Sequence, residues 1–149
     1  MRTFTYVTGS PLRQSFIHIP QTTDGNGLLL YADGVDGDYV ALELYDGALF
    51  FVADAGVGPR FYKVMENMAD DRWHNIEIVQ KTDQTFEFHV DDEARFIDLS
   101  SQGHTIDLDS YLFVGGVPQS RMDTLTNKIN SRKGYAGTYV LASMFDLMT

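Results

Sequence analysis

Residues 27–59 constrain the fold of this chain more than any other segment, because they predict a β-hairpin with a defined turn. In residues 39–45 the large aliphatic side chains recur at every second position, which is the two-residue period of a strand. Val40, Leu42 and Leu44 fall on one face, and Tyr39, Ala41, Glu43 and Tyr45 fall on the other. Asp46-Gly47 follows at once and favours a type I′ turn, since both central residues of that turn need positive φ. The returning strand is predicted over residues 48–54.

The hairpin register brings Asp38 and Ala55 opposite each other at one edge of the predicted sheet. Asp38 lies where a loop meets its strand, and residues 55–59 close the other strand with a glycine-rich turn whose backbone is accessible. A carboxylate beside a main-chain carbonyl offers oxygen ligands to a hard cation. The same spacing also fits an ordinary surface Asp beside a glycine turn.

Short predicted strands separated by turn signals occupy most of the remaining chain, and no segment has a convincing helical period. This pattern is typical of an all-β jelly-roll sandwich of two antiparallel sheets, and a length of 149 residues fits one domain over residues 1–149. Trp73 is expected at the edge of the core. Further strands are predicted at residues 2–8, 15–19, 28–31, 61–65, 73–80, 85–90, 94–97, 106–108, 111–114 and 135–148. The expected core consists of Leu28, Leu30, Val40, Leu42, Leu44, Ile76, Ile78, Phe86, Phe88 and Val114.

Composition excludes several classes of function. The net charge of −10 argues against nucleic acid as a partner, because phosphates require clustered Lys and Arg. With no cysteine, the chain has neither a disulfide framework nor a thiolate metal site. No stretch approaches the roughly 20 apolar residues of a membrane span, and residues 1–9 lack the apolar core of a signal peptide. We therefore expect a soluble, excised domain without membrane insertion.

Acidic side chains on single strand faces are candidates for metal binding or catalysis. Glu87, His89 and Asp91 share one face, and they are either metal ligands or the solvated face of a half-buried strand. A glycosidase requires two carboxylates about 5 to 9.5 Å apart, but no second carboxylate lies two or four positions after Glu43 on its strand face. Nucleophile-elbow, phosphate-loop and His-Glu-x-x-His motifs are absent as well, so we expect no enzymatic activity.

Two later segments carry concentrated charge. Asp107 and Asp109 place two carboxylates on one side of a strand or turn. The same pattern also fits solvated acids that flank a core strand. Residues 119–134 form a polar loop long enough to be either mobile or functional. This loop is locally basic, so it is either solvated or contacts an acidic partner or glycan. Its cations are Arg121, Lys128, Arg132 and Lys133, against the single acid Asp123.

Five segments in order carry a family resemblance: residues 27–31 (GLLLY), 37–44 (GDYVALEL), 46–47 (DG), 71–76 (DRWHNI) and 112–118 (LFVGGVP). Together they resemble a laminin G-like domain of the neurexin kind, also called an LNS domain, over roughly residues 15–145. The GYAG sequence at 134–137 resembles the family's last strand, but Thr138 stands where a cysteine usually follows. The family's late disulfide is therefore missing, and an extracellular address rests on the resemblance alone.

The resemblance implies a jelly-roll fold and a non-catalytic adhesion or receptor module, extracellular or at the cell surface, as one domain of a larger protein. It implies a protein or acidic glycan ligand, such as neuroligins or the glycans of dystroglycan, docked at the loop rim and often bridged by Ca²⁺. The implied Ca²⁺ ligands are the Asp38 carboxylate, the Ala55 carbonyl, the Thr105 or Ile106 carbonyl and the Asp107 side chain, with Asp109 as an alternative. The expected partner-binding residues are Asp38, Gly56, Val57, Gly58, Arg121, Lys128, Arg132 and Lys133.

Two other functions stay open. A lectin-like carbohydrate-binding module would use the same fold and the basic loop. A glycoside hydrolase on this fold is less well supported, because it would need the paired-carboxylate cleft that the strand phases do not supply.

Overall fold

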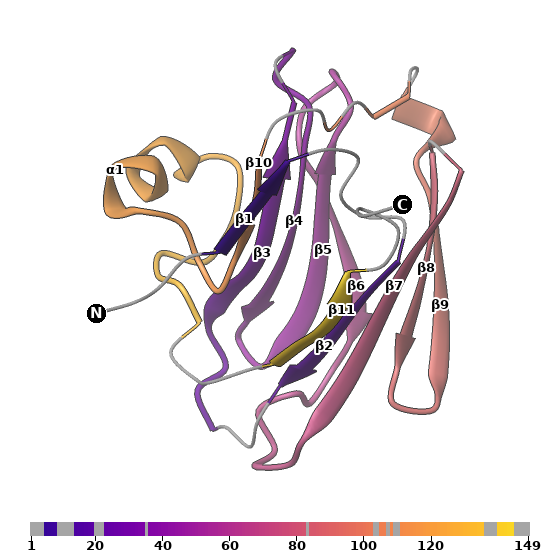
Figure 1. The fold of residues 1–149 in the computed structure, drawn as a ribbon, viewed down its shortest axis with the longest axis vertical. Helices are drawn as coiled ribbons and strands as arrows, with labels where there is room; N and C mark the ends of the chain where they lie inside the picture. Colours follow the sequence, from indigo (N-terminus) through magenta and orange to yellow (C-terminus); the bar gives the residue numbers. More distant parts are fainter. Residues whose placement is uncertain are drawn as a thin grey trace.

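The protein folds into two antiparallel β-sheets that pack face to face (Figure 1). The computed structural model describes residues 5–8, 14–19, 23–34, 36–82, 84–102, 105–106, 108, 111–135 and 140–144. Within these residues, sheet A has the strand order β1-β10-β3-β4-β5-β6 and sheet B the order β11-β2-β7-β8-β9. The strands are β1 (Thr5–Thr8), β2 (Gln14–Ile19), β3 (Gly27–Asp33), β4 (Tyr39–Tyr45), β5 (Ala48–Asp54), β6 (Arg60–Met65), β7 (His74–Thr82), β8 (Thr85–Val90), β9 (Glu93–Asp98), β10 (Tyr111–Val114) and β11 (Val140–Met144).

The predicted all-β sandwich and its central hairpin are confirmed. Strands β4 and β5 have the predicted bounds, and they pair from Tyr45 opposite Ala48 to Tyr39 opposite Asp54. The turn residues Asp46 and Gly47 have φ values of 51° and 81°, both positive as a type I′ turn requires. An Asp-Gly pair between alternating runs was therefore a sufficient signal for this element.

The main core lies between the sheets, where the inward faces of β3, β4 and β5 meet those of β7 and β8. All ten predicted core residues are buried, which confirms the prediction; nine of them lie in this main core, and Leu28 lies in a second hydrophobic cluster. A bulge shifts the pairing of β3 with β4 between Leu28 and Leu30. Leu29 and Leu30 both join the main core as a result, and Leu28 packs on the outer side of sheet A.

A second apolar layer covers that outer side. The segment predicted as a polar loop forms the short helix α1 (Gln119–Met122) and the 3-10 turn η2 (Asp123–Leu125), which lie beside β1, β3 and β10 in Figure 1. Apolar residues within this segment pack on side chains of sheet A, so the loop is part of the fold. The cluster comprises Leu28, Tyr31, Tyr39, Ala41, Val52, Phe113, Val117, Met122, Leu125 and Ile129.

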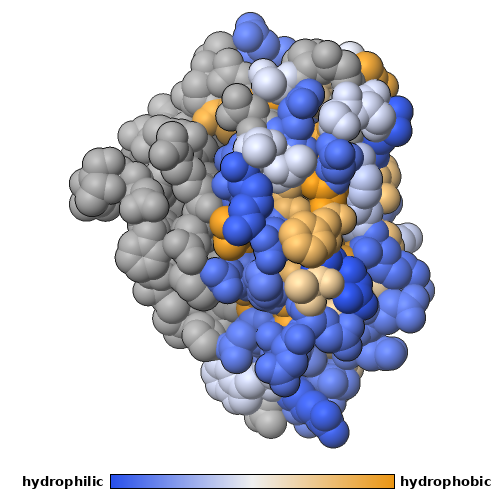
Figure 2. Space-filling model, turned by 90° about the vertical axis from the view of Figure 1, so that its right-hand side faces the viewer, coloured by the Kyte–Doolittle hydropathy of each residue, from blue (hydrophilic) through white to orange (hydrophobic). Residues whose placement is uncertain are grey.

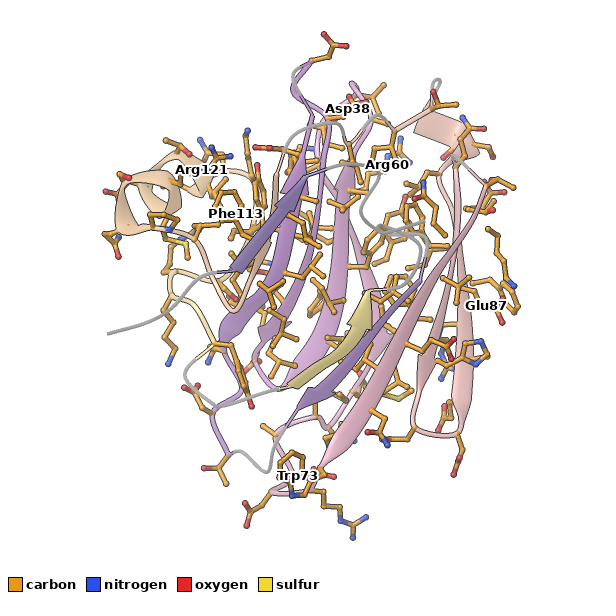
Figure 3. All side chains as sticks on the ribbon, viewed as in Figure 1. Asp38, Arg60, Trp73, Glu87, Phe113 and Arg121 are labelled. Atoms are coloured by element: carbon orange, nitrogen blue, oxygen red, sulfur yellow. The ribbon has the colours of Figure 1, made fainter. Side chains whose placement is uncertain are left out.

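Two expectations were wrong. Trp73 does not pack at the core edge: it precedes β7 and is 59% exposed, at the lower end of the molecule in Figure 3. The predicted strand at 106–108 is also incorrect, because Ile106 and Leu108 lie outside any strand although both are buried in the main core. Their apolar side chains explain the false signal, since burial alone does not distinguish a strand from an irregular segment. In the described part of the chain, no helix is long and apolar enough to cross a bilayer.

Candidate functional site at the rim of sheet A

The candidate site lies at the end of sheet A where the β4–β5 ladder stops. Since Tyr39 pairs with Asp54, the next residues outward are Asp38 and Ala55, which share this rim as predicted. Arg60 belongs to the same rim, because it pairs with Ala53 on β5. Figure 3 shows Asp38 and Arg60 at this upper end of the molecule.

The β3–β4 loop holds Asp38 in place through main-chain hydrogen bonds. The Gly34 N–H donates to the Asp38 carbonyl at 2.9 Å, and the Gly37 N–H donates to the Gly34 carbonyl at 3.2 Å. Gly37 has a φ of +93°, which only glycine adopts without strain, so the loop needs it. Asp38 is only 5% exposed.

The loop after β5 is organised by Asp54, which the sequence reasoning missed. Its Oδ1 atom accepts hydrogen bonds from the Gly56 N–H at 2.8 Å and the Gly58 N–H at 3.1 Å. The available signal was an Asp two residues before a Gly-x-Gly run, the pattern of an Asx-turn. These bonds present Val57, which is 57% exposed, at the tip of a structured loop.

The predicted cation ligands are only partly within the described residues. Ala55 is fully buried and Ile106 is 6% exposed, whereas Thr105 is exposed; Asp107 and Asp109 lie outside the described residues. Where the chain is described, no three His, Asp or Glu side chains gather as a metal cluster. The donors present on the rim are a carboxylate and main-chain carbonyls, the oxygen ligands that suit a hard cation such as Ca²⁺.

The cations Arg121 and Lys133 of the predicted basic loop are engaged within the protein. The Arg121 guanidinium bonds to the Asp33 carboxylate and lies 4.9 Å from the centre of the Phe113 ring, as Figure 3 shows for the labelled pair. The Lys133 ammonium bonds to Asp24 at 2.7 Å, and this bond lowers the pKa of Asp24. Both contacts attach the loop to sheet A or to the segment that precedes β3.

Lys128 and Arg132 likewise hold the loop together. The Lys128 Nζ atom lies 5.2 Å from the centre of the Tyr39 ring, and the Tyr39 hydroxyl donates to the Lys128 carbonyl at 2.9 Å. Arg132 donates to the carbonyls of Thr126 and Ser131. The basic loop is therefore a structural element first, and its contact with a partner stays a prediction.

Glu43 anchors the same loop from within sheet A. Its side chain is fully buried, and its two oxygens accept N–H bonds from Asn130 and Ser131 at 2.8 to 3.1 Å. The Ser131 hydroxyl donates to the Leu44 carbonyl at 2.9 Å. A carboxylate in this position has no access to a substrate, so Glu43 is not a glycosidase residue.

Glu87 and His89 on β8 and Asp91, which follows the strand, do not converge on one metal site. Glu87 bonds to His89 at 2.7 Å and to Lys81 at 3.2 Å. Burial raises the pKa of Glu87, but these two bonds outweigh burial, so the pKa is lower than the ordinary value. Asp91 bonds instead to His74, at 2.8 Å. Figure 2 shows the side of the molecule that carries β8 and β9 as largely hydrophilic around a small apolar group.

This geometry defines an all-β sandwich module of the jelly-roll class, with structured loops at the ends of sheet A. A family model described as Laminin G domain matches residues 21–138. The chain therefore belongs to the laminin G domain family, as an LNS domain of the neurexin type. Membership in this family supports an extracellular adhesion or receptor module.

Two curated relatives have sequences similar to part of this chain, and two solved structures have a similar fold. Neurexin 1 of Drosophila melanogaster is 34% identical over 119 residues, which are 78% of this chain and 6% of that protein. Human neurexin-2 is 29% identical over 120 residues, 78% of this chain and 7% of that protein. The chain thus spans less than a tenth of these relatives.

The solved structures show the fold alone, because their sequences are distant. Domains LG4-5 of the mouse laminin alpha1 chain have a TM-score of 0.68 at 18% identity and cover 95% of this chain and 39% of that one. A galectin of Caenorhabditis elegans has a TM-score of 0.54 at 10% identity and covers 76% of this chain and 84% of that one.

Proposed function

We propose that this domain is a non-catalytic adhesion or receptor module that binds an extracellular protein or glycan through the rim around Asp38, with Ca²⁺ as a weakly bound cofactor. The observation that carries the proposal is the position of Asp38 beside Ala55 at the end of the β4–β5 ladder, next to the loop ordered by Asp54. A structured loop rim on a rigid sheet is where binding residues concentrate.

The surfaces of sheet A leave the rim as the better candidate for recognition. Its inner face is occupied by the core, and part of its outer face is covered by α1 and the segment that follows. At the rim, Val57 is 57% exposed, Phe61 is 42% exposed and Arg60 is exposed as well. An exposed arginine beside apolar side chains is a common composition for the centre of a binding surface.

Ca²⁺ fits the donors on the rim. The Asp38 carboxylate, the Ala55 carbonyl and main-chain or side-chain oxygens of residues 105–109 would contribute ligands, with water completing a shell of about 6 to 8 oxygens. A site with one or two carboxylates binds on the order of 10⁻⁴ to 10⁻³ M, as in extracellular modules. When bound, the ion would reverse the local charge and let an acidic ligand approach a chain of net charge −10.

Calorimetric titration with Ca²⁺ tests the cation site. We expect millimolar or submillimolar binding by the wild type and loss of binding in Asp38→Asn. Asp36→Asn is the matched control, because Asp36 is exposed in the same loop, and it should bind like the wild type. Equal binding by Asp38→Asn, or no binding by the wild type at millimolar Ca²⁺, would contradict the assignment.

Ligand binding is tested separately with the ligand classes that the neurexin resemblance implies, namely a neuroligin ectodomain and dystroglycan glycans. Surface plasmon resonance in Ca²⁺ and in chelator should show calcium-dependent binding that Asp38→Asn and a Val57→Asp substitution weaken. A variant with Arg132 and Lys133 neutralised tests the basic loop as the alternative interface. If Asp38→Asn binds in chelator as well as the wild type does, and the loop variant does not bind, the interface is the basic loop and not the rim.

A further inference from the structure

Strand β6 is a free edge of sheet A. It ends the strand order β1-β10-β3-β4-β5-β6, and none of the described strands pairs with its other side. The register of the central hairpin determines where its free backbone groups lie. Tyr45 and Ala48 flank the two-residue turn and bond to each other through both backbone groups, so every second residue of β5 from Ala48 onward bonds to β4. The residues between them bond to β6.

Two residues of β6, Phe61 and Lys63, turn their N–H and C=O groups away from β5. They lie opposite Val52 and Phe50, whose backbone groups bond to β4. Tyr62 lies between them and bonds to β5. Phe61 is 42% exposed, and the Lys63 side chain is 50% exposed. The edge therefore offers two donors and two acceptors with the spacing that a further strand requires.

A hollow of about 310 Å³ lies beside β6 and reaches the edge strand of sheet B. Its lining comprises Lys63, Val64, Met65, Glu66 and Asn67, together with Arg95 of β9. Tyr62, on the inner side of β6, packs against the main core. A strand added along β6 would thus turn one set of side chains toward this hollow and the other set outward beside Phe61.

The facing edge, β9, is blocked by one of its own side chains. By the same alternation, counted from the β8–β9 turn, Ala94 turns its backbone groups outward. The Arg95 guanidinium donates to the Ala94 carbonyl at 2.9 Å. Charged side chains commonly protect edge strands in native proteins. No side chain of the described residues bonds to the outward backbone groups of Phe61 or Lys63, so β6 is the open edge of the two.

The charge along β6 and the hollow is positive, although the whole chain has a net charge of −10. The charged residues are the cations Arg60, Lys63 and Arg95 and the single acid Glu66. Lys63 bonds to Glu66 at 2.9 Å and Arg95 to Glu93 at 2.8 Å, in pairs that are about half exposed. Exposed pairs of this kind contribute only about 0 to 1 kcal/mol, so the carboxylates of a partner can join them. Arg60 is exposed and has no ion-pair partner among the described residues.

A second copy of this chain is a poor occupant of the edge. It would bring its own Arg60 and Lys63 alongside the first pair, and like charges on neighbouring strands are destabilising. Pro59, which precedes β6, has no N–H and shortens the edge toward the rim. The positive edge fits an acidic strand better than a copy of itself.

We propose that the free edge of β6 binds an acidic, extended segment of a partner protein, which adds to sheet A as an antiparallel strand. The backbone of the segment bonds to Phe61 and Lys63, and an apolar side chain packs beside the Phe61 ring. Its carboxylates lie beside Arg60, Lys63 and Arg95. This surface shares Arg60 and Phe61 with the rim, but it needs neither Asp38 nor Ca²⁺ and thus goes beyond the proposed function.

The test uses the whole chain in chelator and the acidic peptide acetyl-TEEVFET-amide. In antiparallel register the peptide places its phenylalanine beside Phe61 and its glutamates beside the three cations. We expect binding at millimolar peptide. Amide hydrogen exchange at saturation should slow by about tenfold or more at Phe61 and Lys63, whose N–H groups gain acceptors, and much less at Tyr62, which is already bonded to β5.

Three control peptides test the geometry and the charge. The basic peptide acetyl-TKKVFKT-amide should bind more weakly. N-methylation of the acidic peptide at its third and fifth residues, whose N–H groups would face β6, should abolish binding. N-methylation at the second and fourth residues, whose N–H groups would face away from β6, should leave binding intact.

Matched variants locate the peptide. Lys63→Glu should weaken binding by about tenfold, because it places like charges on neighbouring strands. Lys81→Glu is the control, since Lys81 is also an exposed strand lysine bonded to a glutamate, and it should bind like the wild type. Asp38→Asn should bind like the wild type as well, so this test is independent of the cation site.

Four results would overturn the proposal: no binding of the acidic peptide, binding without slowed exchange at Phe61 and Lys63, equal binding after N-methylation at the third and fifth residues, or equal binding by Lys63→Glu and Lys81→Glu. If exchange at Phe61 and Lys63 slows with rising protein concentration and no peptide, the edge belongs to a second copy and the proposal is likewise wrong.

Discussion

Glu43→Ala should destabilise the protein strongly, because Glu43 is a buried acceptor with no substitute. Its carboxylate is 0% exposed and accepts the N–H groups of Asn130 and Ser131. A buried donor left without a partner costs about 1 to 3 kcal/mol. The Ser131 N–H is buried and carries this full cost, whereas the Asn130 N–H is only partly buried and adds less. The expected loss is therefore at least about 1 to 3 kcal/mol, a large part of the roughly 5 to 15 kcal/mol that stabilises a typical domain.

Two measurements separate this loss from a general effect. Urea unfolding gives the change in the free energy of unfolding, and amide hydrogen exchange shows whether the amides of Asn130 and Ser131 lose protection first. Glu43→Gln keeps one oxygen acceptor and should cost less than Glu43→Ala.

Glu93→Ala is the control for Glu43→Ala. It removes a strand glutamate whose side chain is 58% exposed, so it should change stability by no more than about 0.5 kcal/mol. A loss below about 0.5 kcal/mol in Glu43→Ala, with both amides still protected, would refute the assignment of Glu43 as the anchor of the loop.

Two further predictions concern the core and the pH dependence. Leu42→Ala should cost about 2 to 5 kcal/mol in urea unfolding, because Leu42 is fully buried between the sheets, and a cost below about 0.5 would mean that β4 faces the other way. Burial lowers the pKa of His74, but its bonds to Asp91 and Asp70 outweigh burial and raise that pKa above the ordinary 6.5. The bond between Asp70 and His74 also lowers the pKa of Asp70 below 3.8. The His74 contribution to stability is therefore complete below pH 6.5 and lost as pH rises through the raised pKa, whereas the Asp70 contribution is present above pH 3.8 and lost as pH falls through the lowered pKa. Thermal unfolding between pH 3 and 9 should show a flatter alkaline decline in His74→Gln, and an unchanged profile would contradict this role.

Strand periodicity and turn chemistry made the fold predictable from local signals. The alternation of residues 39–45 and the Asp46-Gly47 pair determined the register of β4 with β5, and the register determined that Asp38 and Ala55 share a rim. Each of these steps depends only on the two-residue period of a strand and on the φ values that a type I′ turn allows. No knowledge of the rest of the molecule was needed.

The outer face of sheet A was decided by tertiary structure. Periodicity placed Tyr39 and Glu43 opposite the main core, but it carried no information on whether that face meets water or protein. Residues 119–134 look like a solvated basic loop because their apolar members are sparse, yet they cover this face once Glu43 binds the backbone at 130–131.

The sequence by itself determined the strands, the hairpin register, the inward faces and, through its motifs, the family. The tertiary structure alone decided that the four cations of the loop are engaged by nearby groups, that Leu28 turns outward at a bulge, and that Trp73 is exposed. The physical reason is the range of the interactions. Backbone geometry and side-chain alternation act over a few residues. The partners of Glu43 and Arg121 lie 87 and 88 positions away in the chain, so these contacts form only when the sheets are assembled.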